Sequence, residues 1–186
     1  MFEAERQAHE EKETGRIEAF SDGVFAIALT LLILDIKVPP RDLPAGVSLL
    51  MALTRQWPSY FAYALGFTTI AIMWINHHRL FSLIKRSNDQ LMILNCLLLF
   101  VITFVPFPTA LLSEYLGQPD ERTVALVYCG TSIVIAICFN LLWRYAAFKN
   151  RLLDRNSDPA SIAAISRSYL FGPFVYLMAF ALAFVN

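Results

Sequence analysis

Residues 90–113 read QLMILNCLLLFVITFVPFPTALLS, a run of 24 residues without a single Asp, Glu, Lys or Arg. The hydrocarbon core of a bilayer is about 30 Å thick, and a helix needs roughly 20 apolar residues to cross it. This run is therefore long enough to span a membrane. Three other uncharged runs of comparable length occur in the chain, at 56–78, 123–143 and 168–186.

The composition of the whole chain supports the same interpretation. Of its 186 residues, 57% are hydrophobic and 16% are charged, whereas a soluble domain carries about 25% charged residues. The 15 basic and 15 acidic residues balance, so net basicity gives no reason to expect nucleic-acid binding. A soluble fold could bury one uncharged run, but too little chain would remain to cover all of them. We predict an all-α, polytopic membrane protein with one transmembrane domain.

The sequence predicts five spans after a charged leader at residues 1–15. The first span is the segment Ile17–Lys37, which is apolar except for Glu18, Asp22 and Asp35. The five spans lie near 17–37, 57–78, 90–112, 123–144 and 168–186. With a cytoplasmic N-terminus, 11 Lys and Arg residues flank the inner ends and 4 flank the outer ends. This asymmetry favours that orientation, because cytoplasmic loops are enriched in basic residues.

Two predicted spans contain helix-breaking residues. Pro106 and Pro108 lie late in the third span and should kink it or end it early, because proline removes a backbone hydrogen-bond donor. Gly172-Pro173 should likewise break the start of the last span.

The first span combines a polar cluster with an apolar stripe. At 100° per residue, Asp22 points about 140° away from Ile27, while Ile27, Thr30, Leu31 and Leu34 share one face. An ionisable group in a span usually faces the bundle interior with a partner. Asp22 is therefore a structural partner or a proton carrier. The stripe is either a lipid-facing or packing seam, or the lining of a pathway.

A second polar cluster, Trp74-Ile-Asn-His77-His78-Arg79, lies at the inner end of the second span. Adjacent histidines on a helix point about 100° apart and cannot both bind one metal ion, so we expect no metal site. A direct contact of Asp22 with His77 or with an Arg is geometrically sensible. The chain has no phosphate-binding loop, nucleophile elbow or metalloprotease motif, and we expect no enzyme. It also lacks the carbonyl filter sequence T-V-G-Y-G.

These two clusters resemble the signatures of the transmembrane-protein-175 potassium channels, the endolysosomal channel and its bacterial relatives. The first is residues 16–23, RIEAFSDG, continuing into the apolar helix, and the second is Trp74-x-x-His77 with His78-Arg79. The resemblance implies a homotetramer around a central pore lined by the first helix. It also implies six helices per repeat, one more than the five spans predicted here.

The resemblance also implies roles for individual residues. Ile27 would form the narrowest ring of the pore, Leu31 and Leu34 further apolar rings, and Thr30 a hydroxyl layer. A network of side chains would hold the first helix in place, formed by Arg16, Phe20, Ser21, Asp22, Trp74 and His77.

The leading hypothesis is a potassium-permeable cation channel with a hydrophobic gate. A ring of Ile or Leu conducts only when it is wide enough to hold water, and Asp35 at the outer mouth would concentrate cations. The expected partners are further copies of the chain, the lipid bilayer and monovalent cations, with no nucleic acid and no cofactor besides permeant K+. The expected location is a prokaryotic inner membrane.

Two alternatives remain open at this stage. One is a proton-coupled secondary transporter or proton pathway that uses Asp22 and His77 as a relay. Against it stand the missing pair of broken helices and the lack of inverted repeats. The other is a membrane scaffold without transport.

Overall fold

The computed structural model describes residues 2–154 and 158–185, and these form helices and short connections. Five long helices make up the bundle, and they are α1 Phe2–Leu31, α3 Trp57–Leu83, α4 Asp89–Ile102, α6 Glu121–Ala147 and α7 Pro159–Val185. Shorter elements connect or extend them, and they are α2 Leu49–Arg55, α5 Pro106–Tyr115 and the 3₁₀ turns Leu32–Asp35 and Phe148–Asn150. The predicted all-α class is confirmed.

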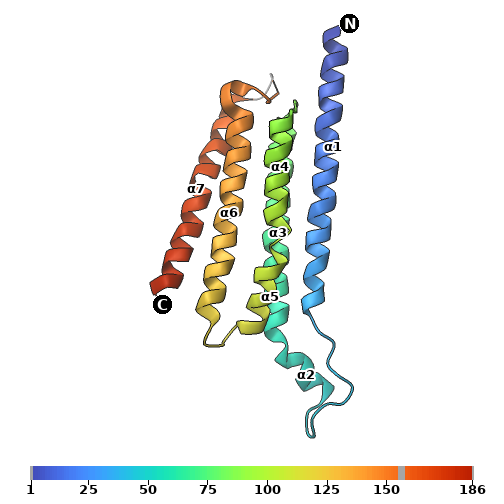
Figure 1. Ribbon diagram of the computed structural model, residues 1–186, viewed down its shortest axis with the longest axis vertical. Coiled ribbons are helices and arrows are strands. Elements are labelled where there is room, and N and C mark those ends of the chain that lie inside the picture. Colours follow the sequence, from blue (N-terminus) through green and yellow to red (C-terminus); the bar gives the residue numbers. More distant parts are fainter. Residues whose placement is uncertain (1, 155–157, 186) are drawn as a thin grey trace.

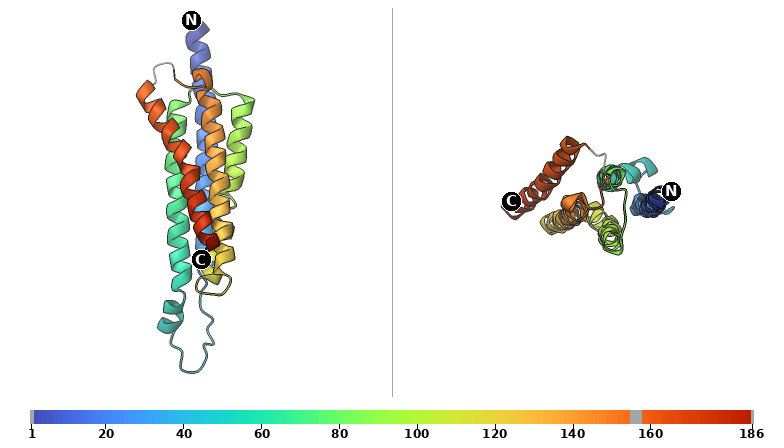
Figure 2. Two further views of the ribbon diagram at one scale, coloured as in Figure 1. Left: turned by 90° about the vertical axis from the view of Figure 1, so that its left-hand side faces the viewer. Right: turned by 90° about the horizontal axis from the view of Figure 1, so that it is seen from above.

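The long helices run side by side along one axis, with α1 at one edge of the bundle and α7 at the opposite edge (Figure 1). The N-terminal part of α1 extends beyond the ends of its neighbours, and α2 projects at the other end of the molecule. Seen along the bundle axis in Figure 2, α1 and α7 again lie at opposite sides. Residues 2–15, which belong to the predicted charged leader, form the first part of α1 without a break.

Four helical segments among the described residues are long and apolar enough to cross a membrane. They are Thr14–Asp35, Trp57–Leu83, Asp89–Tyr115 and Glu121–Asn150. The sequence predicted one more, at 168–186. The described part of that segment, residues 168–185, belongs to α7, a helix of 27 residues, and residue 186 lies outside the described residues. The predicted break at Gly172-Pro173 is wrong, because α7 continues through both residues.

The predicted kink in the third span is confirmed, because the span divides into α4 and α5. Pro106 has no N–H to donate to the carbonyl of Ile102. That carbonyl instead accepts a shorter-range bond from the backbone N of Val105 at 3.0 Å. At its start, α4 is capped by Asn88, whose side chain accepts from the backbone N of Leu91 at 2.9 Å, as expected for an N-cap Asn.

One face of α1 joins the core of the bundle. Phe25, Ala28 and Leu32 are almost completely buried, at intervals that place them on a single side of the helix. They pack with buried residues of the neighbouring helices, among them Ile70 of α3 and Leu98 of α4. This packing fixes the rotation of α1 about its own axis and therefore decides which residues point away from the bundle.

Candidate functional site

The side of α1 that faces away from the core carries a stripe of bare apolar side chains. Ile27 is 60% exposed, Leu31 43% and Leu34 62% in the isolated chain. Their spacing of four and three residues keeps them on one face. α1 lies at the edge of the bundle (Figure 2), and within the described part of the chain no other helix covers this stripe. We call Ile27, Leu31 and Leu34 the α1 stripe.

Polar groups accompany the α1 stripe. The hydroxyl of Thr30 donates to the carbonyl of Ile27 at 2.9 Å and is exposed on the same helix. At the end of the helix, the ammonium of Lys37 donates to the carbonyl of Leu34 at 2.7 Å. Asp35 lies in the 3₁₀ turn Leu32–Asp35 and is half-buried. The end of the stripe is therefore followed by two charged residues, Asp35 and Lys37.

A chain of buried hydrogen bonds connects α1 to α3 and α4 on the opposite side. The amide of Asn95 donates to the hydroxyl of Ser21 at 3.0 Å, and Ser21 donates to the carbonyl of Ile17 at 2.8 Å. Since the Asn95 amide nitrogen is the donor in that bond, its oxygen accepts from Nε2 of His77 at 2.9 Å. This arrangement assigns the proton of a neutral His77 to Nε2. Nδ1 of His77 is buried and has no hydrogen-bond partner among the residues that the structure describes.

Aromatic rings enclose His77 and isolate it from water. Phe25 meets the imidazole edge-on with ring centroids 5.4 Å apart, and Phe81 stacks on it at 4.5 Å. The ring is therefore held in one orientation by two apolar neighbours and one hydrogen bond.

A second, more exposed pair of contacts links α1 to α3. The indole N–H of Trp74 donates to the carboxylate of Asp22 at 2.8 Å, and Nδ1 of His78 contacts the carboxylate of Glu18 at 2.7 Å. Trp74 and His78 also stack on each other. Among the described residues, the predicted direct contact of Asp22 with His77 or with an Arg does not form. His77 turns inward to Asn95 of α4, whereas Trp74, one turn earlier on α3, reaches Asp22.

The structure brings four of the six expected network residues together, namely Ser21, Asp22, Trp74 and His77. Phe20 is 62% exposed and makes no hydrogen bond, so it lies outside this network within one chain. With Arg16 it lines a pocket of about 430 Å³ between α1 and α4. In the described part of the chain, no group of three or more His, Cys, Asp or Glu could hold a metal ion.

Comparison with known proteins places the chain in a family. The family model "Endosomal/lysosomal potassium channel TMEM175" matches residues 16–106. A potassium channel of Chamaesiphon minutus is 53% identical over 180 residues, which cover 97% of this chain and 89% of that protein. The chain belongs to the TMEM175 family. It is a multi-pass membrane protein whose relatives are named channels rather than enzymes.

Two further relatives of this TMEM175 chain are informative. The crystal structure of a lysosomal potassium-selective channel TMEM175 homolog from Chamaesiphon minutus matches with a TM-score of 0.84 and 51% identity, covering 94% of this chain and 88% of that one. The human protein named endosomal/lysosomal proton channel TMEM175 is 38% identical over 146 residues. That match covers 74% of this chain but 29% of the human protein.

Two residues that take part in these contacts of the TMEM175 chain, Asn95 and Glu18, are not part of the predicted network. Asn95 lies in the third span, within the uncharged run 90–113. A polar amide at membrane depth is a signal in itself, because it needs a hydrogen-bond partner on a neighbouring helix. Glu18 carries the same signal in the first span.

Proposed function

We propose that the protein is a potassium-permeable cation channel whose pore is constricted by the α1 stripe. The observation that carries the proposal is the contrast between the two faces of α1. Phe25, Ala28 and Leu32 are buried in the bundle, whereas Ile27 and Leu34 are more than half exposed. In the membrane, this exposed face contacts either lipid or other subunits. The relatives named potassium channels favour the second arrangement, in which copies of α1 from several subunits surround a pore.

A ring of Ile27 side chains would act as a dewetting barrier. Apolar side chains offer no oxygen to replace the hydration shell of an ion, so conduction requires a ring wide enough to hold water. Discrimination between K+ and Na+ would then follow from their different dehydration costs. The hydroxyl of Thr30 lies one turn further along α1 and can supply a polar layer next to the ring.

Assembly as a homotetramer would complete such a pore. In this proposal α1, which lies at the edge of the bundle (Figure 2), is the only helix of a chain that lines the pore, so several copies are needed to enclose a pathway. Four is the number that the resemblance to the TMEM175 channels implies. We further propose a bacterial inner membrane with the N-terminus in the cytoplasm, which is supported by the 11 to 4 distribution of Lys and Arg.

Flux of K+ and Na+ into liposomes that contain purified protein tests the pore assignment. We expect K+ to be preferred, and we expect the preference to change in Ile27→Asn, because the amide would offer oxygen ligands and water at the constriction. Ile93→Asn is the matched control, because Ile93 is 67% exposed but lies on α4. Equal effects of the two substitutions, or no flux through a folded oligomer, would contradict the proposal.

The cation-attracting role of Asp35 has its own test. If Asp35 is repeated around a symmetry axis, its charge raises the local cation concentration at the mouth. Asp35→Asn should therefore lower conductance in dilute salt, where the Debye length is about 30 Å at 0.01 M, and much less at 1 M, where it is about 3 Å. Asp42→Asn, an exposed change in the same outer connection, should have the smaller effect. An Asp35→Asn defect that does not depend on salt would exclude this role.

A proton pathway is the second candidate function. It is favoured by the human relative's name, a proton channel, and by the presence of two titratable groups, Asp22 and His77, on the adjacent helices α1 and α3. In this candidate Asp22 and His77 would relay protons, in a channel or in a proton-coupled transporter. Asp22→Asn and His77→Gln would then abolish flux driven by a pH gradient and leave K+ flux intact. Loss of both fluxes together would assign the two residues to structure instead.

A further inference from the structure

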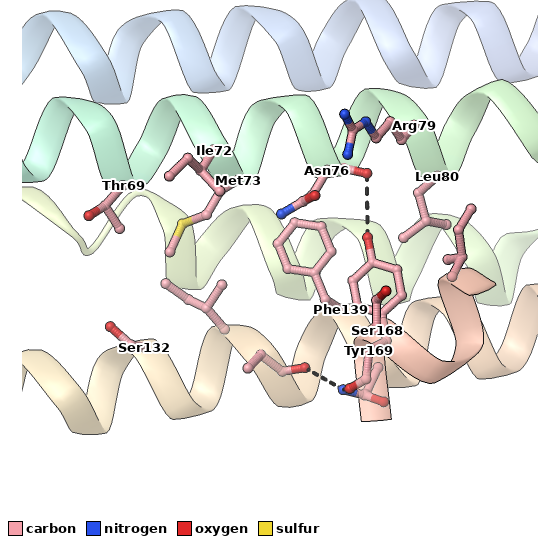
Figure 3. A pocket seen from close by; sticks show the side chains of 14 residues that line it. Thr69, Ile72, Met73, Asn76, Arg79, Leu80, Ser132, Phe139, Ser168 and Tyr169 are labelled. Carbon is pink, nitrogen blue, oxygen red and sulfur yellow. Dashed lines mark hydrogen bonds between the residues drawn. The ribbon is translucent and has the colours of Figure 1, made fainter. Parts of the chain in front are cut away.

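A pocket separate from the α1 stripe lies between α3, α6 and α7. Its volume is about 310 Å³, at the lower end of the range for small-molecule sites. Apolar side chains form its walls, including Ile72 and Met73 of α3 and Phe139 of α6 (Figure 3). None of these residues belongs to the network that holds α1.

Two polar side chains of α3 lie together at one end of this pocket. Figure 3 shows Arg79 and Asn76 next to each other, three residues apart and on the same face of the helix. Among the described residues, neither side chain makes a hydrogen bond or an ion pair. The backbone carbonyl of Asn76 accepts from the hydroxyl of Tyr169 at 3.4 Å, which ties α7 to α3 beside this pair.

The pocket carries a net positive charge. Among the described residues that line it, Arg79 is the only charged one, and no Asp or Glu lies beside it. The guanidinium of Arg79 and the amide of Asn76 both offer N–H donors to this pocket, and such donors suit the oxygens of a phosphate. The site therefore complements an anionic group attached to something apolar.

Depth along α3 indicates where that anionic group lies. Arg79 follows Trp57, the first residue of α3, by 22 positions, and at 1.5 Å per residue this separates them by about 33 Å. Since the hydrocarbon core is about 30 Å thick, Arg79 lies at the headgroup level when Trp57 lies at the opposite interface. Along α3 the lining of the pocket extends from Arg79 to Thr69, which lies about 15 Å deeper in the hydrocarbon region.

We propose that this pocket binds an acidic phospholipid from the leaflet at the N-terminal end of α1. The phosphate contacts Arg79 and Asn76, and one acyl chain lies along Ile72, Met73 and Phe139 toward Thr69. Basic pockets between transmembrane helices bind acidic headgroups in this manner. The proposal is independent of the conduction pathway, because it concerns the side of α3 that faces α6 and α7 instead of α1.

Native mass spectrometry of the purified full-length protein tests this site. The protein is equilibrated in detergent with equal amounts of phosphatidylglycerol and phosphatidylcholine, and the lipids retained per chain are counted. We expect preferential retention of phosphatidylglycerol. Arg79→Gln should lower that retention about fivefold, since one basic residue near an anionic lipid contributes about 1 kcal/mol. Retention of phosphatidylcholine should not change.

Arg167→Gln is the matched control, because Arg167 is exposed on α7 at the same end of the bundle and does not line the pocket. It should leave phosphatidylglycerol retention unchanged. Ala136→Phe fills the apolar wall without altering charge and should lower retention of phosphatidylglycerol. Equal losses of phosphatidylglycerol retention in the Arg79 and Arg167 variants would mean that the lipid is attracted by the overall surface charge and not by this pocket. That result would overturn the proposal.

Two other outcomes would also overturn it. If glycerol phosphate displaces phosphatidylglycerol at equal concentration, the site binds a free phosphate and needs no acyl chain. If the wild type shows no preference and Arg79→Gln dissociates the oligomer, a neighbouring copy of the chain occupies the groove. Neither result depends on ion flux, so the lipid site and the channel function fail separately.

Discussion

At the scale of single residues, Asn95 is the central link between three helices. Its amide donates to Ser21 of α1 and its oxygen accepts from His77 of α3, and all three side chains are buried. Each group therefore satisfies a neighbour that has no access to water. A buried donor or acceptor left without its partner costs about 1–3 kcal/mol.

Asn95→Leu tests this link, because leucine has a similar size but neither donates nor accepts. We expect the variant to lose about 1–3 kcal/mol of stability, since the Ser21 hydroxyl and Nε2 of His77 lose their partner. The loss should appear as a lower midpoint of thermal unfolding, measured as the oligomer that survives heating in detergent. Cys96→Ala changes the exposed neighbour and should leave the midpoint unchanged. A wild-type midpoint in Asn95→Leu would show that the network contributes little to folding.

At the scale of elements, Gly66 sets the distance between α3 and α5. A Cβ added at Gly66 would lie 2.9 Å from two side-chain atoms of Thr109 and 3.3 Å from Leu32. The close approach also anchors the 3₁₀ turn that follows α1, because Leu32 begins this turn and is buried. Thr109 is itself held by a bond from its hydroxyl to the carbonyl of Val105 at 3.0 Å, so it has little freedom to move away.

Gly66→Ala should therefore destabilise the protein, although alanine is the better helix former. Overpacking of this kind costs typically 1–3 kcal/mol, and we expect a corresponding fall in the thermal midpoint. Gly130→Ala is the matched control in α6, where the added Cβ would meet a ring carbon of Phe180 at an ordinary 3.9 Å. It should be neutral or slightly stabilising. The same response at both glycines would exclude a special role for the contact between α3 and α5.

The sequence predicts these elements well and their side-chain pairing poorly. Membrane thickness fixes the length of a span, so uncharged runs locate the helices, and Pro106 locates the division of the third. Pairing depends instead on how each helix rotates against its neighbours. The predicted contact of Asp22 with His77 failed for that reason, because Trp74 reaches Asp22 while His77 turns to Asn95. A single helical wheel cannot show which neighbour a residue meets.

A helical wheel of α1 does predict that its polar residues and its exposed apolar residues lie on different faces. The rotation of 100° per residue predicts that Asp22 and Ile27 lie on different faces of α1. In the structure Asp22 contacts Trp74 of α3, and Ile27 is exposed. Whether Ile27 contacts lipid or another subunit depends on how the whole molecule assembles.

At the scale of the whole molecule, α1 lies at the edge of the chain, opposite α7 (Figure 2), and its stripe is exposed. Lipid also covers exposed apolar residues, and Ile93 on α4 is as bare as Ile27. Exposure therefore does not distinguish a pore from a lipid-facing seam. Proximity between copies does, because a narrow ring brings the same residue of neighbouring chains together and a lipid-facing residue never meets its own copy.

Ile27→Cys in a background without the native Cys96, Cys129 and Cys138 measures that proximity. A disulfide needs Cα atoms within about 4.4–6.8 Å, so a tight ring at Ile27 should give cross-linked dimers on mild oxidation. Ile93→Cys in the same background should stay monomeric on a denaturing gel. The intact complex should have the mass of four chains of 21.1 kDa. Cross-linking at Ile93 but not at Ile27 would place the α1 stripe in lipid, and a different mass would revise the number of subunits.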